Sequence, residues 1–174
     1  MERTPRGTSV GVEDPYEHVV RCDHLTDDGT CRFALEWPGL DLAFARARAR
    51  EDYRCPVAAE EWHWADCPKF RSRSTDRVCA RCGLEEHRVA HEDDRPLLQE
   101  HHLSYADAGP LAHEITVHLC RWCHAKVHRS WAAIDDDVGP DPEALAEREA
   151  RRSRELDELS FRSAAERRQG SSGR

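Results

Sequence analysis

The chain has 174 residues, of which 39% are hydrophobic and 7% aromatic, so one or two small domains would share a thin apolar core. It has no apolar run approaching about 18 residues and no signal peptide, which argues against a membrane protein and predicts a cytoplasmic location. A reducing compartment disfavours disulfides among the eight cysteines and favours metal ions as staples of the core.

Basic residues gather in two stretches, although the formal net charge is −8. An acidic chain contacts phosphates only where Lys and Arg are locally concentrated. Residues 69–81 contain a single carboxylate, and residues 115–134 contain none. The candidate DNA-contacting residues of these stretches are Arg71, Arg73, Arg77, Arg121, Lys126 and Arg129.

Lysine is rare, since Lys69 and Lys126 are the only two in the chain. A sequence rich in Asp and Glu and poor in Lys is typical, by analogy, of proteins adapted to high intracellular salt. We therefore expect a halophilic protein, in which salt weakens phosphate binding and local contacts must compensate.

In chain order, residues 1–15 are polar and contain glycine, which predicts a flexible tail. Residues 16–70 are expected to form a first module, with a helix over residues 40–53 after the Pro38-Gly39 break. Trp62 and Trp64 alternate before Cys67, which indicates either a short strand or simple core residues.

Four cysteines fall within this first module: Cys22, Cys31, Cys55 and Cys67. None of their spacings is Cys-x2-Cys, so the prediction that they share a metal rests on their number in a short segment. Zn²⁺ is the first choice. An iron–sulfur cluster is the alternative, because Cys55-Pro56 and Cys67-Pro68 are similar to cluster-binding segments.

Residues 71–77 are expected to be a polar linker or a phosphate-contacting strap, followed by a second module over residues 78–134. Two strands are predicted at residues 97–103 and 115–119. A helix is predicted over residues 121–134, because Val127, Trp131 and Ile134 form an i, i+4, i+7 apolar stripe. Residues 142–168 have helix-forming composition and are expected to dock lightly, and residues 169–174 form a tail.

The second module contains two Cys-x2-Cys knuckles, Cys79/Cys82 and Cys120/Cys123. At this spacing a tight turn lets two thiolates bind one tetrahedral Zn²⁺, so the four cysteines predict a closed structural zinc site. Four histidines belong to the same pattern: His101 and His102 on the first predicted strand, and His124 and His128 one turn apart on the helix.

This order of knuckle, His-His, knuckle and trailing histidines resembles the HNH, or ββα-metal, nucleases over residues 77–131. The resemblance implies an α+β fold with a zinc-stabilised ββα-metal module, to which the N-terminal four-cysteine module and the C-terminal helix are added. It also implies His102 as general base and His101, His124 and His128 as ligands of a catalytic metal.

The middle Asn of that family has no counterpart, because the chain contains no asparagine. His113 or Glu114 occupies roughly its position, and Glu114 is the second candidate catalytic residue. Neighbouring strand residues point to opposite faces, so His101 can bind metal while His102 meets substrate only if the hairpin twists or bulges there. In the alternative, His124 or His128 replaces a zinc thiolate and His101 is a core residue.

The expected function is metal-dependent hydrolysis of phosphodiester bonds in duplex DNA with little sequence preference. An all-imidazole site suits Zn²⁺, Ni²⁺ or Mn²⁺ better than Mg²⁺, which prefers oxygen ligands. The alternative function is a non-catalytic zinc module that binds nucleic acid or a protein partner.

Overall fold

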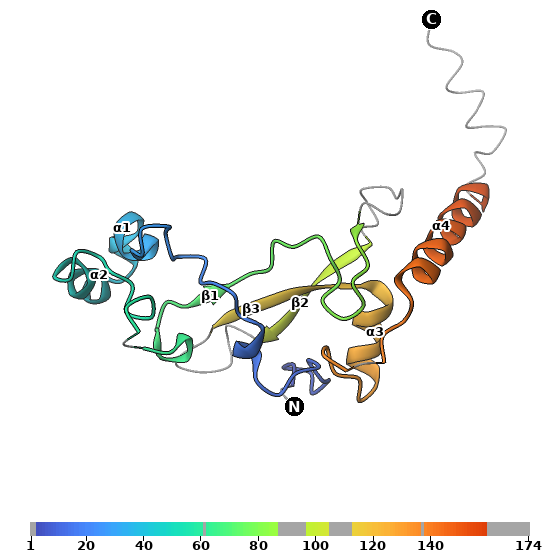
Figure 1. The fold of residues 1–174 in the computed structure, drawn as a ribbon, viewed down its shortest axis with the longest axis horizontal. Coiled ribbons are helices and arrows are strands. Elements are labelled where there is room, and N and C mark those ends of the chain that lie inside the picture. The colour runs from blue at the N-terminus through green and yellow to red at the C-terminus, as the bar shows by residue number, and fades with distance from the viewer. Residues whose placement is uncertain (1–2, 61, 87–96, 105–112, 137, 160–174) are drawn as a thin grey trace, which may run out of the picture.

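The computed structural model describes residues 3–60, 62–86, 97–104, 113–136 and 138–159. Three strands occupy the middle of the molecule, α1 and α2 lie at one end, and α4 projects away at the other (Figure 1). The predicted α+β class is confirmed. Residues 160–168 of the predicted C-terminal helix, and the tail at 169–174, fall outside the described residues.

The centre of the fold is an antiparallel hairpin of β2 (Leu98–Ser104) and β3 (Glu114–Cys120). β-branched residues in β3 favour the extended backbone, and its inward side chains Ile115 and Leu119 are almost fully buried. Both strands lie within one residue of their predicted bounds. The register shifts between His102 and Ser104, where the strand departs from regular pairing.

A third strand, β1 (Arg71–Ser72), pairs in parallel with β3 and gives the sheet the order β1-β3-β2. The prediction of a polar linker over residues 71–77 is therefore wrong for Arg71 and Ser72, which belong to the sheet. Asp23 accepts hydrogen bonds from Arg71 Nε at 3.0 Å and from the Arg73 backbone N–H at 3.1 Å. These contacts fasten the first module to the sheet.

Helix α3 (Arg121–Arg129) follows β3 directly but ends earlier than predicted. Ser130 is extended, and its hydroxyl donates to the Lys126 carbonyl at 2.7 Å, which satisfies one terminal acceptor of the helix. Trp131 is consequently 85% exposed and not part of the apolar stripe, which corrects the prediction. Ile134 is still buried, because the chain turns back and its N–H donates to the Gly11 carbonyl at 2.8 Å.

The N-terminal segment packs against this helix, so the prediction of a flexible tail is wrong for residues 8–12. Val10 and Val12 are buried in the main core. Gly11 has φ +84°, and a Cβ there would come within 2.7 Å of the Val127 side chain. A thin core explains the difference, since the hairpin and α3 lack enough apolar residues of their own to cover this face.

The first module contains short elements: η1 (Pro15–His18), α1 (Arg32–Glu36), η2 (Pro38–Leu40), α2 (Leu42–Ala49) and η3 (Trp64–Asp66). Helix α2 is shorter than predicted, because Asp52 and Tyr53 adopt positive φ and turn the chain. Trp62 and Trp64 form no strand. They are partly buried against the main core, in agreement with the simpler interpretation.

Helix α4 (Pro142–Leu159) docks through its first half. Leu145 is buried, and Glu149 Oε2 pairs with Arg121 Nη2 at 3.0 Å. The light docking predicted for this helix agrees with these contacts. Among the described residues, none of the helices combines the length and apolar character needed to cross a lipid bilayer.

Candidate metal centres

The two knuckles meet in one cluster of four cysteines: Cys79, Cys82, Cys120 and Cys123. Their sulfurs all lie within 4.8 Å of one another, and those of Cys82 and Cys120 are 3.9 Å apart. Zinc–sulfur bonds of about 2.3 Å in a tetrahedron place ligand sulfurs about 3.8 Å apart. The cluster therefore fits one metal ion such as Zn²⁺.

Local backbone geometry builds each knuckle. Gly83 takes φ +72° and its N–H donates to the Cys79 carbonyl at 2.8 Å, which turns the chain after the first pair. Cys120 is the N-cap of α3, where its sulfur accepts from the Cys123 N–H at 3.5 Å. Both pairs thus face inward from tight turns.

Hydrogen bonds among the four sulfurs divide the thiols of the cluster into two kinds. They hold the pKa values of Cys79 and Cys82 below the usual range of a thiol, whereas the pKa values of Cys120 and Cys123 are raised. Arg81 is 8% exposed, and its Nη1 lies 3.8 Å from Cys123 Sγ. This buried guanidinium offsets negative charge on the sulfurs. Sequence reasoning missed that role, although Arg81 stands between the first two cysteines.

A second group joins three histidines from two elements, His101 on β2 with His124 and His128 on α3. One nitrogen from each ring lies within 4.8 Å of the others, and the ring centroids are 4.6 to 5.2 Å apart. The group is separate from the cysteine cluster. The alternative in which His124 or His128 replaces a zinc thiolate is therefore wrong.

Hydrogen bonds fix which nitrogens face the centre of this group. His101 Nε2 donates to the Val10 carbonyl at 2.8 Å, and His128 Nδ1 donates to the Ser9 carbonyl at 3.0 Å. The lone pairs therefore sit on His101 Nδ1 and His128 Nε2. His101 Nδ1 is buried without a hydrogen-bond partner among the described residues, which is costly unless an ion satisfies it.

Burial keeps His101 and His124 in the neutral form that can bind metal. It lowers the pKa of His101 to about 4, and it lowers the pKa of His124 with help from the charge of His128. Near neutral pH these rings are uncharged and offer lone pairs. The roles of Ser9 and Val10 could not be predicted from the sequence, because both residues act through backbone carbonyls, which every residue has.

His102 lies beside the histidine group but does not belong to it. Its Nε2 is 3.8 Å from Glu114 Oε1, and both side chains are about one-third exposed. The register shift predicted to be necessary falls directly after His102. His113 is buried, and its ring packs against Tyr16 and Phe70. Of the two residues predicted to stand at the position of the family's Asn, Glu114 is therefore the one that lies next to His102.

Four of the six candidate DNA-contacting residues form ion pairs within the protein. Arg71 and Arg73 pair with Asp23, and the other two ion pairs are Arg77–Glu86 at 3.5 Å and Arg121–Glu149 at 3.0 Å. Lys126 and Arg129 are exposed on α3 and form no ion pair within the described part of the chain.

Arg129 also borders a cavity of about 280 Å³ next to His128. Arg3, Thr8 and Trp131 form other parts of its wall. Two guanidinium groups and an exposed indole thus surround an opening at the edge of the histidine group. Arg3 was not among the sequence candidates, since it lies in the segment predicted to be a tail.

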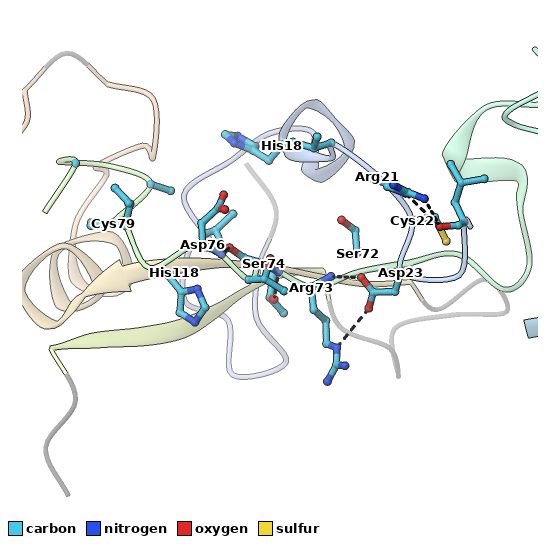
Figure 2. A pocket seen from close by; sticks show the side chains of 18 of the residues that line it. His18, Arg21, Cys22, Asp23, Ser72, Arg73, Ser74, Asp76, Cys79 and His118 are labelled. Atoms are coloured by element: carbon cyan, nitrogen blue, oxygen red, sulfur yellow. Dashed lines mark hydrogen bonds and ion pairs between the residues drawn. The ribbon is translucent and has the colours of Figure 1, made fainter. Parts of the chain in front are cut away.

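A larger cavity of about 850 Å³ lies elsewhere, between the first module and β3. Figure 2 shows it with Cys79 towards one side and Cys22 towards the other, and with Asp23 bonded to Arg73. Its lining includes none of the three histidines of the second group. This cavity is therefore a gap between the two cysteine-containing regions and separate from the histidine centre.

The four cysteines of the first module are buried, but they do not form a third tight group. All four lie in the described chain, and no three of their sulfurs come within 4.8 Å of one another. The prediction of sulfurs at the spacing of a single ion is therefore not met in this structure.

The chain belongs to the family of unknown function DUF7097, which matches residues 1–167. No curated protein and no solved structure matches it.

Proposed function

We propose that this protein is a metal-dependent endonuclease of the HNH type that hydrolyses DNA phosphodiester bonds. The observation that carries the proposal is the convergence of His101, His124 and His128 on one point between a hairpin and the following helix. Three convergent imidazole nitrogens leave coordination positions open, as catalytic metal sites do and closed structural sites do not.

The ligand set favours Zn²⁺, Ni²⁺ or Mn²⁺ over Mg²⁺, because every donor is an imidazole nitrogen. A bound ion would supply Lewis acidity toward the phosphate oxygens. The chain contributes the orientation: Val10 and Ser9 hold the His101 and His128 rings by their outer N–H groups.

His102 is the proposed general base, which takes the proton from the attacking water. Glu114 stands 3.8 Å from its Nε2 and would stabilise the imidazolium that forms. Glu114 would thus orient the base from the position where the resembling family has Asn. Partial exposure of His102 lets a water molecule and a phosphate reach it.

The DNA is proposed to approach along α3 past His128. Lys126 and Arg129 are exposed there, and Arg3 and Trp131 border the adjoining cavity. Cationic side chains contact phosphates without reading sequence, which is consistent with duplex DNA and low specificity. A cytoplasmic location follows from the need to keep the cysteines reduced, and the acidic composition fits a salt-rich interior.

Plasmid nicking tests the proposal directly. Purified protein is assayed with Zn²⁺, Ni²⁺, Mn²⁺ and Mg²⁺, with and without chelator, at low and high salt. We expect chelator-sensitive nicking with at least one of the first three ions. Failure with every ion and salt, in a protein that retains its zinc, would overturn the nuclease.

That same result would favour the second candidate, a non-catalytic zinc module for nucleic acid or protein partners. The observation in its favour is the lack of any asparagine. DNA binding by gel shift, without cleavage, would then identify the nucleic-acid form of that candidate.

A further inference from the structure

The cavity beside the histidine group lies between the N-terminal turn, residues 3–9, and the end of α3. Arg3 and Ser9 form an antiparallel bridge, and Arg3 Nη1 donates to the Gly7 carbonyl at 2.8 Å, which closes the turn. His128 Nδ1 donates to the Ser9 carbonyl at 3.0 Å, so the turn is fastened to α3. The cavity of about 280 Å³ therefore has a built wall on each side and adjoins one of the three convergent histidines.

Cationic, hydroxyl and aromatic groups line this cavity. Arg3 and Arg129 are exposed and supply two guanidinium groups. Thr8 and Ser130 supply hydroxyls, and Trp131 supplies an indole that is 85% exposed. In the described part of the chain, the wall contains no carboxylate side chain. The local charge therefore favours an anionic ligand, although the chain as a whole is acidic.

The position of Trp131 is fixed by the way α3 ends. Ser130 is extended, and its hydroxyl donates to the Lys126 carbonyl at 2.7 Å and accepts from the Ala132 N–H at 3.3 Å. These bonds hold the chain on both sides of the indole. A flat ligand that covered the indole would remove apolar surface from water. Because the other side chains of the wall are polar or cationic, an aromatic anion fits this cavity better than an apolar peptide does.

The volume and chemistry of the cavity fit one nucleotide. Pockets for drug-sized ligands occupy about 300 to 1,000 Å³, and this cavity of about 280 Å³ lies just below that range. Duplex DNA presents its phosphates at the surface, but the faces of its bases are covered by stacking on their neighbours. A nucleotide outside the stack offers a phosphate to the guanidinium groups and a base face to the indole.

We propose that this cavity binds one unpaired nucleotide of the DNA, with its base stacked on Trp131 and its phosphate bound by Arg3 and Arg129. The inference rests on the proposed nuclease function and narrows its substrate to duplex DNA that carries an unpaired nucleotide beside the hydrolysed bond. His128 belongs both to the cavity wall and to the histidine group, so an occupied cavity brings the adjoining phosphodiester to that group. Stacking accepts every base, which agrees with a low sequence preference.

Fluorescence anisotropy with three labelled duplexes tests this proposal. The first duplex contains one unpaired thymidine, the second has an abasic residue at the same position, and the third is fully paired. No divalent ion is added, and a gel verifies that the DNA stays intact. We expect the unpaired thymidine to bind about 5- to 150-fold more tightly than the abasic residue, which is the range for one stacked base. Equal affinities for these two duplexes would overturn the proposal, because only the base distinguishes them.

Variants of Trp131 test where the base binds. Trp131→Ala should remove the difference between the unpaired thymidine and the abasic residue and leave the affinity for the paired duplex unchanged. The indole is 85% exposed, so its removal should not disturb folding. The matched variant Trp131→Phe keeps an aromatic face and should keep most of the difference. A difference that persists in Trp131→Ala would overturn the assignment of the base to this cavity.

Nicking of the same three duplexes separates this inference from the nuclease itself. With an ion that supports plasmid nicking, the wild type should cleave the first duplex next to the unpaired thymidine. Binding that depends on the base, without any cleavage, would support the cavity and overturn the nuclease. Cleavage of all three duplexes with equal affinity would support the nuclease and overturn the nucleotide-binding cavity.

Discussion

The Val10 carbonyl accepts the Nε2–H of His101 at 2.8 Å, so a residue near the N-terminus orients a ring on β2, 91 positions away. The neighbouring Ser9 carbonyl does the same for His128. Residues 8–12 therefore act as a strap that holds the histidine centre from outside. Removing either hydrogen bond is expected to weaken metal binding about 10- to 100-fold.

Gly11 offers a way to disturb this strap without touching a ligand. Gly11→Ala places a methyl group within 2.7 Å of Val127 at φ +84°, so both steric overlap and backbone strain oppose it. We expect a decrease of about 2 to 4 kcal/mol in the free energy of unfolding, together with weaker Ni²⁺ binding by calorimetry.

Gly7→Ala is the matched control. Gly7 has a similar φ of +79°, but a Cβ there meets nothing within 4 Å. The substitution should cost only about 1 kcal/mol of backbone strain and leave Ni²⁺ binding unchanged. Equal effects of the two variants would show that the strap does not press on α3.

The proposed base and the proposed ligand should respond differently to metal. His102→Ala should lower the nicking rate by about 10² to 10⁴-fold with metal content close to wild type, because only proton transfer is impaired. His128→Ala should also lower the rate, but added metal should partly restore it. Wild-type activity of His102→Ala in a chelator-sensitive assay would remove His102 from the mechanism.

Glu114→Gln tests the carboxylate 3.8 Å from His102 Nε2. Replacing the carboxylate removes the charge proposed to orient and stabilise the His102 ring during proton transfer, so the maximal nicking rate should fall. The affinity for Ni²⁺ should stay constant, because Glu114 is not among the proposed ligands. An unchanged rate would mean that Glu114 has no effect on the base.

Exposed arginines with and without an ion pair among the described residues should differ in DNA binding. Arg129→Ala removes an exposed cation beside His128, so the slope of log K against log salt should become shallower by about 0.9 for each phosphate that the variant no longer neutralises. Arg77→Ala is the control, because Arg77 pairs with Glu86. If both variants change the slope equally, DNA does not approach along α3.

His113 should make stability depend on pH. Burial lowers the pKa of His113 below the value of 6.5 that it has in the unfolded chain. Below about pH 6.5, His113 is therefore more fully protonated in the unfolded chain than in the folded one. The contribution of His113 is therefore complete above about pH 6.5 and declines as pH falls below it. In urea titrations at constant salt, His113→Leu should flatten this dependence. Parallel curves for wild type and variant would contradict the assignment.

The sequence by itself determined the features that depend on neighbours in the chain. Cys-x2-Cys places two sulfurs on one turn whatever surrounds it, so the knuckles were predictable. His124 and His128 share a helix face because four residues make about one turn. Alternating β-branched residues likewise predicted β3 within one residue of its observed bounds.

The tertiary structure alone decided the features that depend on contacts across the sequence. Ser9 and Val10 act through backbone carbonyls, which every residue has, so no pattern could distinguish this strap from a tail. Trp131 stands at a position that fits the apolar period of the predicted helix. The helix nevertheless ends at Arg129, because Ser130 adopts an extended conformation. The choice of Glu114 over His113 as the neighbour of His102, and the wide spacing of the first-module cysteines, arose from packing between segments. The spacing of residues in the sequence determines toward which side of a helix or strand each side chain points. The distances between side chains on different elements are instead set by how the core packs those elements together.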